Sequence, residues 1–209
     1  MIAFSCGSCG KAFNVPETYA GRSARCKGCG AMVTVPSAPV APLPSPTPPP
    51  KVPMRIRRLR ADAEEIASAF RKSTTICVTP AGGGEPPDMY RIEYRVDGLA
   101  RGPDGKPMPR DRHAVEIQLS SEYPRVSPKC KMLTPAFHPN IDAASICVGD
   151  HWTAGERLVD LVIRIGEMIA YQEYNIRSPL DAEAAMWADL NAGKLPIDAR
   201  DLRPMEDDV

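Results

Sequence analysis

The chain has 209 residues, of which 43% are hydrophobic and 25% charged, a composition typical of a globular protein. Basic and acidic residues balance at 26 each, so no net charge draws the chain to nucleic acid or to an anionic membrane. The first residues lack the pattern of a secretory signal, and no apolar run is long enough to span a bilayer. We therefore expect a cytoplasmic protein with no membrane partner, with nucleic acid disfavoured as a partner, and with its seven cysteines reduced or metal-bound.

Residues 1–36 contain two C-x-x-C pairs separated by sixteen residues, a spacing typical of a four-thiolate zinc site. The cysteines are Cys6, Cys9, Cys26 and Cys29. Each pair is followed by a glycine, Gly10 or Gly30, which can take the positive φ that such a turn requires. C-G-S-C-G-K-A-F-N-V-P is echoed by C-K-G-C-G-A-M-V-T-V-P, so the segment is a repeat of two knuckles. We predict a zinc ribbon that holds one structural Zn²⁺, against the alternatives of redox pairs or disulfides.

Four cysteine ligands leave the predicted ion no open coordination position, so we expect a docking role and not a catalytic one. The segment resembles short ribbons found at the N-termini of many otherwise unrelated bacterial proteins. Nine of the eighteen residues from Pro36 to Pro53 are proline, which excludes helix and sheet there. We interpret 37–53 as a proline-rich linker; a P-x-x-P ligand for an SH3-type domain is the alternative.

Residues 54–200 are long enough for one substantial core. Apolar residues at three- and four-residue steps predict a helix from Met54 to Phe70. Arg55, Arg57 and Arg58 lie near its start, where the positive end of the helix disfavours them, which hints at an acidic partner. An ordinary solvated helix face is the alternative.

Four segments of alternating apolar and polar residues predict strands, and together they predict a four-stranded antiparallel meander with one covered face. They are Thr74 to Thr79, Tyr90 to Val96, Val115 to Leu119, and Cys130 to Met132. Loops rich in glycine and proline, at 80–88 and 98–109, would connect them. Cys77 and Cys130 lie inside these strands, so we expect both to be small buried hydrophobic residues.

The period then changes from two residues to that of a helix. Thr153 and Glu156 fit a capping box, and the apolar stripe after them predicts a helix that covers the sheet. The stripe is Leu158, Leu161, Val162, Ile165, Met168 and Ile169. The Ser-Pro step at 178–179 signals the start of a last helix with its body at 182–190, and residues 201–209 form an acidic tail. The fold class is therefore α+β.

The order helix, four strands, H-P-N loop, cysteine, helix, helix resembles that of ubiquitin-conjugating enzymes (E2s). Five local motifs are similar to motifs of that family. They are Y-P-R-V-S-P-K at 123–129, F-H-P-N-I-D at 137–142, S-I-C at 145–147, W-T-A-G at 152–155 and S-P-L-D-A-E-A-A at 178–185. The resemblance covers nearly all of residues 54–193 and implies the UBC (E2) fold, a four-stranded sheet flanked by helices.

The resemblance implies that Cys147 accepts the C-terminal acyl group of a ubiquitin-like protein from an activating enzyme (E1). Cys147 would carry the group as a thioester and pass it to an acceptor amine or other nucleophile on a protein substrate. It also implies that Asn140 stabilises the oxyanion or holds the loop, and that His138 and Pro139 set the loop's shape. Ser178 stands where the family often places Asp or Ser, and its hydroxyl could orient an amine. The helix arginines would then meet the E1 or another partner.

The chemistry of these residue types agrees with the resemblance. Proline fixes its own φ and biases His138 toward an extended conformation, which sets the direction of Asn140. A side-chain amide N–H can meet a developing oxyanion. Nothing near Cys147 looks like an activating base, because Asp150 would disfavour the thiolate and only a protonated His151 would favour it. The neutral hydroxyl of Ser178 can orient an acceptor amine but cannot attract its charged form, so suppression of the amine's charge would depend mainly on burial.

Departures from the family pattern limit what carries over. The gaps from Asn140 to Cys147 and from Cys147 to Trp152 are short, W-T-A-G lacks the family's proline, and Met132 replaces the usual aromatic residue of the neighbouring loop. These features argue against dependence on a RING-type ligase (E3) and suggest a bacterial ubiquitin-like conjugation system. The alternatives are an inactive E2-like variant that only binds a ubiquitin-like protein, with the zinc ribbon as its docking module, or a zinc-ribbon nucleic-acid binder.

Overall fold

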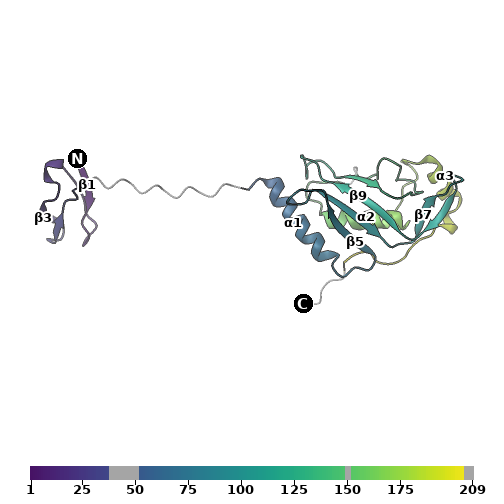
Figure 1. The fold of residues 1–209 in the computed structure, drawn as a ribbon, viewed down its shortest axis with the longest axis horizontal. Coiled ribbons are helices and arrows are strands. Elements are labelled where there is room, and N and C mark those ends of the chain that lie inside the picture. The colour runs from purple at the N-terminus through teal and green to yellow at the C-terminus, as the bar shows by residue number, and fades with distance from the viewer. Residues whose placement is uncertain (38–51, 149–151, 205–209) are drawn as a thin grey trace. The chain divides into compact units, whose positions relative to one another are not determined.

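A computed structural model of the chain describes residues 1–37, 52–148 and 152–204. The chain divides into two compact units, residues 1–50 and 51–209, and each is described by itself (Figure 1). Most of the predicted linker lies outside the described residues, as do Asp150, His151 and the end of the predicted tail. Among the helices that the structure describes, none has both the length and the apolar character needed to cross a bilayer.

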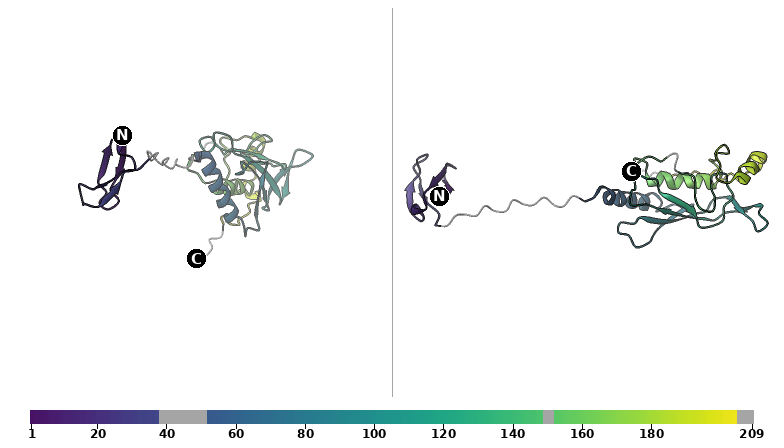
Figure 2. Two further views of the ribbon diagram at one scale, coloured as in Figure 1. Left: turned by 60° about the vertical axis from the view of Figure 1, so that its left-hand side comes forward. Right: turned by 90° about the horizontal axis from the view of Figure 1, so that it is seen from above.

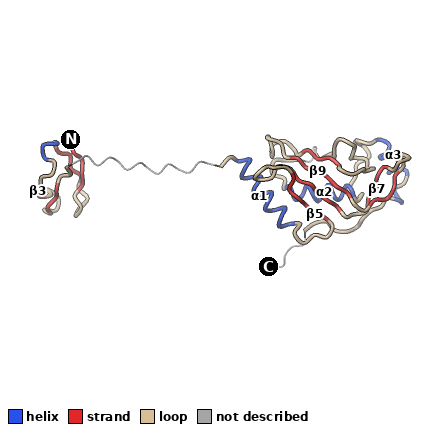
Figure 3. Tube along the Cα trace, viewed as in Figure 1, coloured by secondary structure: helices blue, strands red, loops and turns tan. Residues whose placement is uncertain are grey.

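The first unit consists of two short antiparallel hairpins (Figure 3). Strand β1 (Ile2–Ser5) pairs with β2 (Ala12–Val15), and β3 (Ser23–Arg25) pairs with β4 (Met32–Thr34). A short 3-10 helix, η1 (Glu17–Tyr19), lies between the hairpins. Each hairpin turn carries one C-x-x-C pair, so the sequence repeat corresponds to a structural repeat.

The second unit begins with α1 (Met54–Ala69), which confirms the predicted helix to within one residue at its end. Its apolar residues Leu59 and Ile66 are buried. The helix starts directly after Pro53, which has no N–H and lies in an extended conformation with ψ of 144°.

Four antiparallel strands form the central sheet, in the order β10-β9-β6-β5. They are β5 (Ile76–Ala81), β6 (Met89–Tyr94), β9 (His113–Gln118) and β10 (Lys129–Met132). Alternate residues of the two central strands point into the core, which buries Ile92, Tyr94, Val115 and Ile117. Helices α1 and α2 lie on the same side of this sheet (Figure 2).

Two predictions about these strands were wrong. The predicted loop at 98–109 contains a hairpin, β7 (Gly98–Arg101) and β8 (Pro107–Arg110), whose prolines weakened the strand signal. A two-stranded hairpin leaves one edge of each strand unpaired, so it tolerates residues without an N–H. Cys77 is exposed, because β5 is an edge strand whose alternation turns Ile76 inward and Cys77 outward. Cys130 is buried, as predicted.

The later helices are α2 (Leu158–Ile169), α3 (Ala182–Leu190) and the 3-10 helix η3 (Ala192–Lys194). The predicted capping box does not cap α2, since the N-cap is Arg157 and Glu156 N donates to Thr153 O in a preceding turn. The Ser-Pro step does not start α3 either. Asp181 is its N-cap, and the Asp181 carboxylate accepts a hydrogen bond from Ala184 N.

Tyr171 holds the connection between α2 and α3 in a left-handed conformation, with φ of 56°. A non-glycine residue is strained there unless its surroundings compensate. Tyr171 is buried, and its hydroxyl donates to Phe137 O. It belongs to a small apolar cluster, separate from the main core, with Leu99, Phe137, Ala184 and Ala188.

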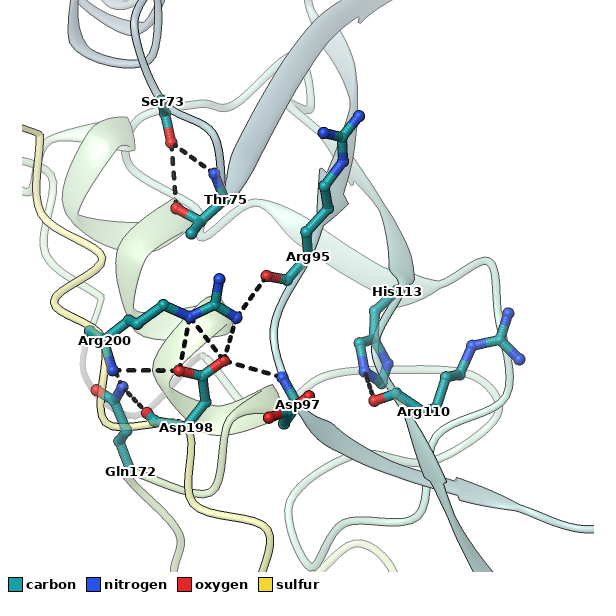
Figure 4. A network of polar contacts seen from close by, with 9 residues as sticks. All are labelled: Ser73, Thr75, Arg95, Asp97, Arg110, His113, Gln172, Asp198 and Arg200. Atoms are coloured by element: carbon teal, nitrogen blue, oxygen red, sulfur yellow. Dashed lines mark hydrogen bonds and ion pairs between the residues drawn. The ribbon is translucent and has the colours of Figure 1, made fainter.

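After α3 the chain returns along the sheet and is held there by polar contacts (Figure 4). The Asp198 carboxylate accepts from Asp97 N at 3.0 Å and pairs with Arg200, which donates to Arg95 O at 2.8 Å. Gln172 Nε2 donates to the carbonyls of both Asp198 and Arg200. Leu202 is buried in the main core, so the packed chain continues past residue 200.

Candidate functional site

The segment 137–147 folds into a tight loop beside β10. Isolated bridges pair His138 with Ile141 and Ile141 with Ile146. Ile146 N donates to Cys130 O and Cys147 N donates to Asn140 O, both at 3.0 Å. The backbone therefore brings Cys147 directly beside Asn140, although seven positions separate them in the chain.

Cys147 is partly exposed and lines a cavity of about 460 Å³. The other side chains that line it come from the H-P-N loop, from α2 and from the segment that follows α2. They include Asn140, Arg164, Gln172, Glu173 and Ser178. Three of the residues that the sequence singled out, Cys147, Asn140 and Ser178, therefore meet at one cavity that is open to an incoming group.

The carboxamide of Asn140 is hydrogen-bonded to the segment 175–178, which also contributes to this cavity. Its Nδ2 donates to the carbonyls of Asn175 at 2.9 Å and Ser178 at 3.3 Å, while its Oδ1 accepts from Asn175 N at 2.6 Å. An amide nitrogen has two hydrogens, so both are in use. Of the two roles implied for Asn140, these contacts fit support of the loop.

His138 belongs to this loop, and its side chain is buried, with the residue only 2% exposed. Its Nδ1 accepts a hydrogen bond from Asn140 N at 3.1 Å, and its ring meets that of Tyr171 edge to face at 4.8 Å. Burial lowers the pKa of His138 to about 4, so the ring is neutral near pH 7. A buried neutral ring positions the loop and does not supply a proton to the cavity.

Sequence reasoning missed two charged residues that line the cavity, Arg164 and Glu173. Arg164 had a detectable signal, because it is the one basic residue inside the otherwise apolar run from Leu161 to Gly166. Glu173 follows the end of α2 with no pattern around it. Its place depends on the turn at Tyr171, which the sequence did not predict.

The three arginines predicted to meet a partner differ in accessibility. Arg55 donates to the carbonyls of Leu119 and Ser120, so it ties α1 to the end of β9. Arg57 is exposed. Arg58 donates to both carboxylate oxygens of buried Asp62 at 2.9 Å and is half-buried. Of the three, Arg57 alone is exposed.

The four cysteines of the first unit form a candidate metal centre, with all four Sγ atoms within 4.8 Å of one another. Cys6 and Cys29 lie 3.7 Å apart, and Cys9 and Cys26 lie 3.6 Å apart. A regular tetrahedron of sulfurs at about 2.3 Å from zinc has an edge of about 3.8 Å. Disulfides would need about 2 Å, so the cluster is compatible with zinc and not with those bridges.

The turns of this centre agree with the predicted glycine conformations, since φ is +73° at Gly10 and +76° at Gly30. The two knuckles repeat the same backbone bond, from Gly10 N to Cys6 O and from Gly30 N to Cys26 O. Backbone N–H groups, of Gly28 first and then of Cys29, lower the pKa of the Cys26 thiol to about 6. A thiolate is the form that binds zinc.

Comparison with known proteins extends this picture. A family model described as ubiquitin-conjugating enzyme matches residues 86–194, just over half of the 209 residues. The chain is 32% identical over 94 residues to "Probable ubiquitin-conjugating enzyme E2 31" of Arabidopsis thaliana, covering 43% of this chain and 60% of the relative. It is 30% identical over 95 residues to "Ubiquitin-conjugating enzyme E2 21" of Caenorhabditis elegans, covering 43% and 44%.

The chain thus spans less than two thirds of the length of these curated relatives. The fold is similar to the crystal structure of a Plasmodium yoelii protein assigned as a ubiquitin conjugating enzyme. The TM-score is 0.51 at 20% identity, over 68% of this chain and 88% of that one. Because the family model covers more than half of the sequence and takes in the whole H-P-N loop and Cys147, the chain belongs to the ubiquitin-conjugating enzyme family.

Proposed function

We propose that the protein is an E2-like conjugating enzyme that accepts a ubiquitin-like protein from an E1 as a thioester on Cys147. The modifier then passes to an amine or other nucleophile of a protein substrate. The observation that carries this proposal is the partly exposed Cys147 on an open cavity beside Asn140. A buried structural cysteine such as Cys130 would offer no such access.

In the transfer step, the acceptor nitrogen bonds to the thioester carbonyl carbon, the C–S bond breaks, and Cys147 leaves as a thiolate. The amine proton passes to solvent. A lysine with a pKa near 10.4 is about 3.4 units from neutral at pH 7, which corresponds to about 4.6 kcal/mol. Desolvation in the cavity offsets part of that, and the Ser178 hydroxyl can orient the amine.

The remaining site residues act on shape and partner choice in this proposal. His138 and Asn140 hold the loop in register with the segment 175–178, so that Cys147 faces the cavity. Arg57 is the α1 arginine best placed to meet an E1, while Arg55 and Arg58 mainly hold the domain together. Dependence on a RING-type E3 is not expected, because W-T-A-G lacks the family's proline.

The ribbon binds one structural Zn²⁺ through Cys6, Cys9, Cys26 and Cys29 and serves as a docking module in this proposal. A unit of this size cannot bury enough apolar surface to fold alone, so metal binding supplies much of its folding free energy. A bacterial, cytoplasmic conjugation system remains the setting predicted from the sequence.

The test uses ubiquitin as the probe modifier, delivered by its E1 with ATP or as a chemically prepared ubiquitin thioester. We expect an adduct that reductant removes, that Cys147→Ala abolishes, and that Cys77→Ala and Cys130→Ala retain. Absence of an adduct by both routes would favour the second candidate, an inactive variant that only binds the modifier. The presence of a cysteine at the cavity speaks against that candidate.

A further inference from the structure

The cavity beside Cys147 contains a positive charge that no part of the proposed function uses. Arg164 comes from the middle of α2, where its neighbours Ile163 and Ile165 are buried, and its side chain is only 21% exposed. Removing a guanidinium from water is costly unless a partner compensates. A guanidinium at this position therefore needs partners that offset the cost of its burial.

Glu156 supplies part of the compensation. Its Oε1 lies 2.7 Å from Arg164 Nη2, and its carboxylate is 11% exposed. The pair is an ion pair and not a well-aligned hydrogen bond, since Arg164 Nε and Nη2 are buried and have no hydrogen-bond partner of good geometry among the described residues. Nε and Nη2 are closed off from solvent, so Nη1, with its two N–H donors, is the guanidinium nitrogen that remains for a ligand in the cavity.

Arg164 shares a cavity with Cys147, and its charge acts on Cys130, which is bonded to the segment of Cys147. Burial raises the pKa of Cys130 to about 12, and Arg164 opposes that rise, so its field reaches the Cys130 thiol. The Cys130 carbonyl accepts from Ile146 N at 3.0 Å, and Ile146 directly precedes Cys147. Cys147 and Arg164 both line the cavity of about 460 Å³.

The side-chain amides of Asn140 and Gln172 also line this cavity, but their N–H groups are already engaged. Both amide hydrogens of Asn140 go to the carbonyls of Asn175 and Ser178. Those of Gln172 go to the carbonyls of Asp198 and Arg200. Arg164 is thus the charged donor among the described residues that line the cavity, and Glu173 is their one acidic group.

We propose that Arg164 is a further catalytic residue, whose guanidinium donates a hydrogen bond to the carbonyl oxygen of the acyl group on Cys147. As the acceptor nitrogen bonds to the carbonyl carbon, negative charge grows on that oxygen and Arg164 stabilises it. The C–S bond then breaks and the charge leaves with the Cys147 thiolate. Glu156 is a positioning residue that holds the guanidinium. The inference rests on the proposed function.

The first measurement is the single-turnover discharge of a ubiquitin thioester on Cys147 to free lysine. Three variants are compared with the wild type, Arg164→Gln, Arg164→Lys and Arg157→Gln. Arg157 is the control, since it begins the same helix and pairs with Glu65 at 2.8 Å while more than half exposed. We expect Arg164→Gln to slow discharge by about tenfold or more at saturating lysine, a modest value for loss of an oxyanion donor. Arg164→Lys should recover part of the rate.

The second measurement needs no modifier and has its own fold control. Iodoacetamide alkylation at pH 7 is followed by peptide mass spectrometry for Cys147, exposed Cys77 and buried Cys130. Loss of a nearby positive charge disfavours the thiolate. Arg164→Gln should therefore slow alkylation of Cys147 several-fold relative to Cys77 and leave Cys130 protected. Arg157→Gln should leave the ratio unchanged, and misfolding would reveal itself as fast alkylation of Cys130.

The outcomes separate this inference from the proposed function. If Arg164→Gln discharges and alkylates at wild-type rates with Cys130 protected, Arg164 has no catalytic role while the thioester function stands. If the wild type takes no acyl group on Cys147, the proposed function fails, and with it the oxyanion role of Arg164.

Discussion

His138 is a histidine that folding keeps unprotonated. Its pKa is about 4 in the folded state against an ordinary value of 6.5, because burial disfavours the charged ring. Between these values the unfolded chain binds a proton that the folded chain does not. Stability should therefore fall as the pH drops from about 6.5 to 4, by about 3 kcal/mol from this residue. His113 is also buried with a lowered pKa, so it adds to the trend in the same direction.

The variant His138→Asn isolates the contribution of His138. Its side-chain oxygen can accept from Asn140 N as Nδ1 does, and it does not titrate. Urea unfolding at pH 7, 5.5 and 4.5, followed by tryptophan fluorescence, should show a smaller acid loss for the variant than for the wild type. Both tryptophans, Trp152 and Trp187, lie in the second unit, so the signal reports that unit alone. Equal losses in both proteins would show that His138 is not buried in solution.

Individual site residues were predictable to different degrees. Cys147 stood next to an H-P-N motif, and the backbone bond to Asn140 needs only that short loop. The engagement of Asn140 with Asn175 and the position of Glu173 were not predictable. Both depend on a chain reversal at Tyr171, where a bulky residue takes a conformation that usually signals glycine.

The α1 helix contributes a buried polar network and not only an apolar stripe. Asp62 is 2% exposed and accepts hydrogen bonds from Arg58 and from the Tyr123 hydroxyl at 2.6 Å. Arg58 also donates to the carbonyls of Ala154 and Glu156, in the segment just before α2. This network connects α1 to the residue that holds Arg164.

Substitution of Arg58 should therefore be costly. Arg58→Ala leaves the buried Asp62 carboxylate without its cation, and we expect a loss of about 3 kcal/mol in the free energy of unfolding. Arg57→Ala removes the same charge from an exposed site one residue away and should change stability by no more than about 0.5 kcal/mol. In the E1 assay, Arg57→Ala should slow charging with ubiquitin while leaving exchange with the ubiquitin thioester intact. Similar stabilities for the two variants would contradict the network.

Helices and strands with a strong period were predictable, and their ends were not. The apolar stripe located α2, while the helix start moved from Thr153 to Arg157 because Glu156 is used in an ion pair with Arg164. The β7–β8 hairpin was not predicted because strand β8 is only four residues long and contains two prolines. Tertiary contacts from Arg101 to Asp181 and Glu183 tie this hairpin to α3, which no local pattern shows.

The two compact units predict separable functions. Deletion of residues 1–53 should leave the second unit folded and Cys147 chargeable, because the core that the described residues of this unit form is made of residues from Leu59 onward. Zinc chelation of the full chain should have the same effect as deletion, since the ribbon loses its four-thiolate centre while the tryptophan signal stays unchanged. Thioester formation on the probe ubiquitin and choice of substrate are the two readouts. Loss of charging in a folded truncation would show that the ribbon takes part in catalysis.

The separate apolar cluster of Leu99, Phe137, Tyr171, Ala184 and Ala188 has a dynamic consequence. Regions with few buried contacts open at lower free energy than a central sheet does. The end of the domain that carries α3 and the β7–β8 hairpin can thus open locally while the central sheet stays folded. Asn140 is hydrogen-bonded to the segment that leads into α3, so such local opening would widen the cavity beside Cys147 for a bulky acceptor while the rest of the domain stays folded.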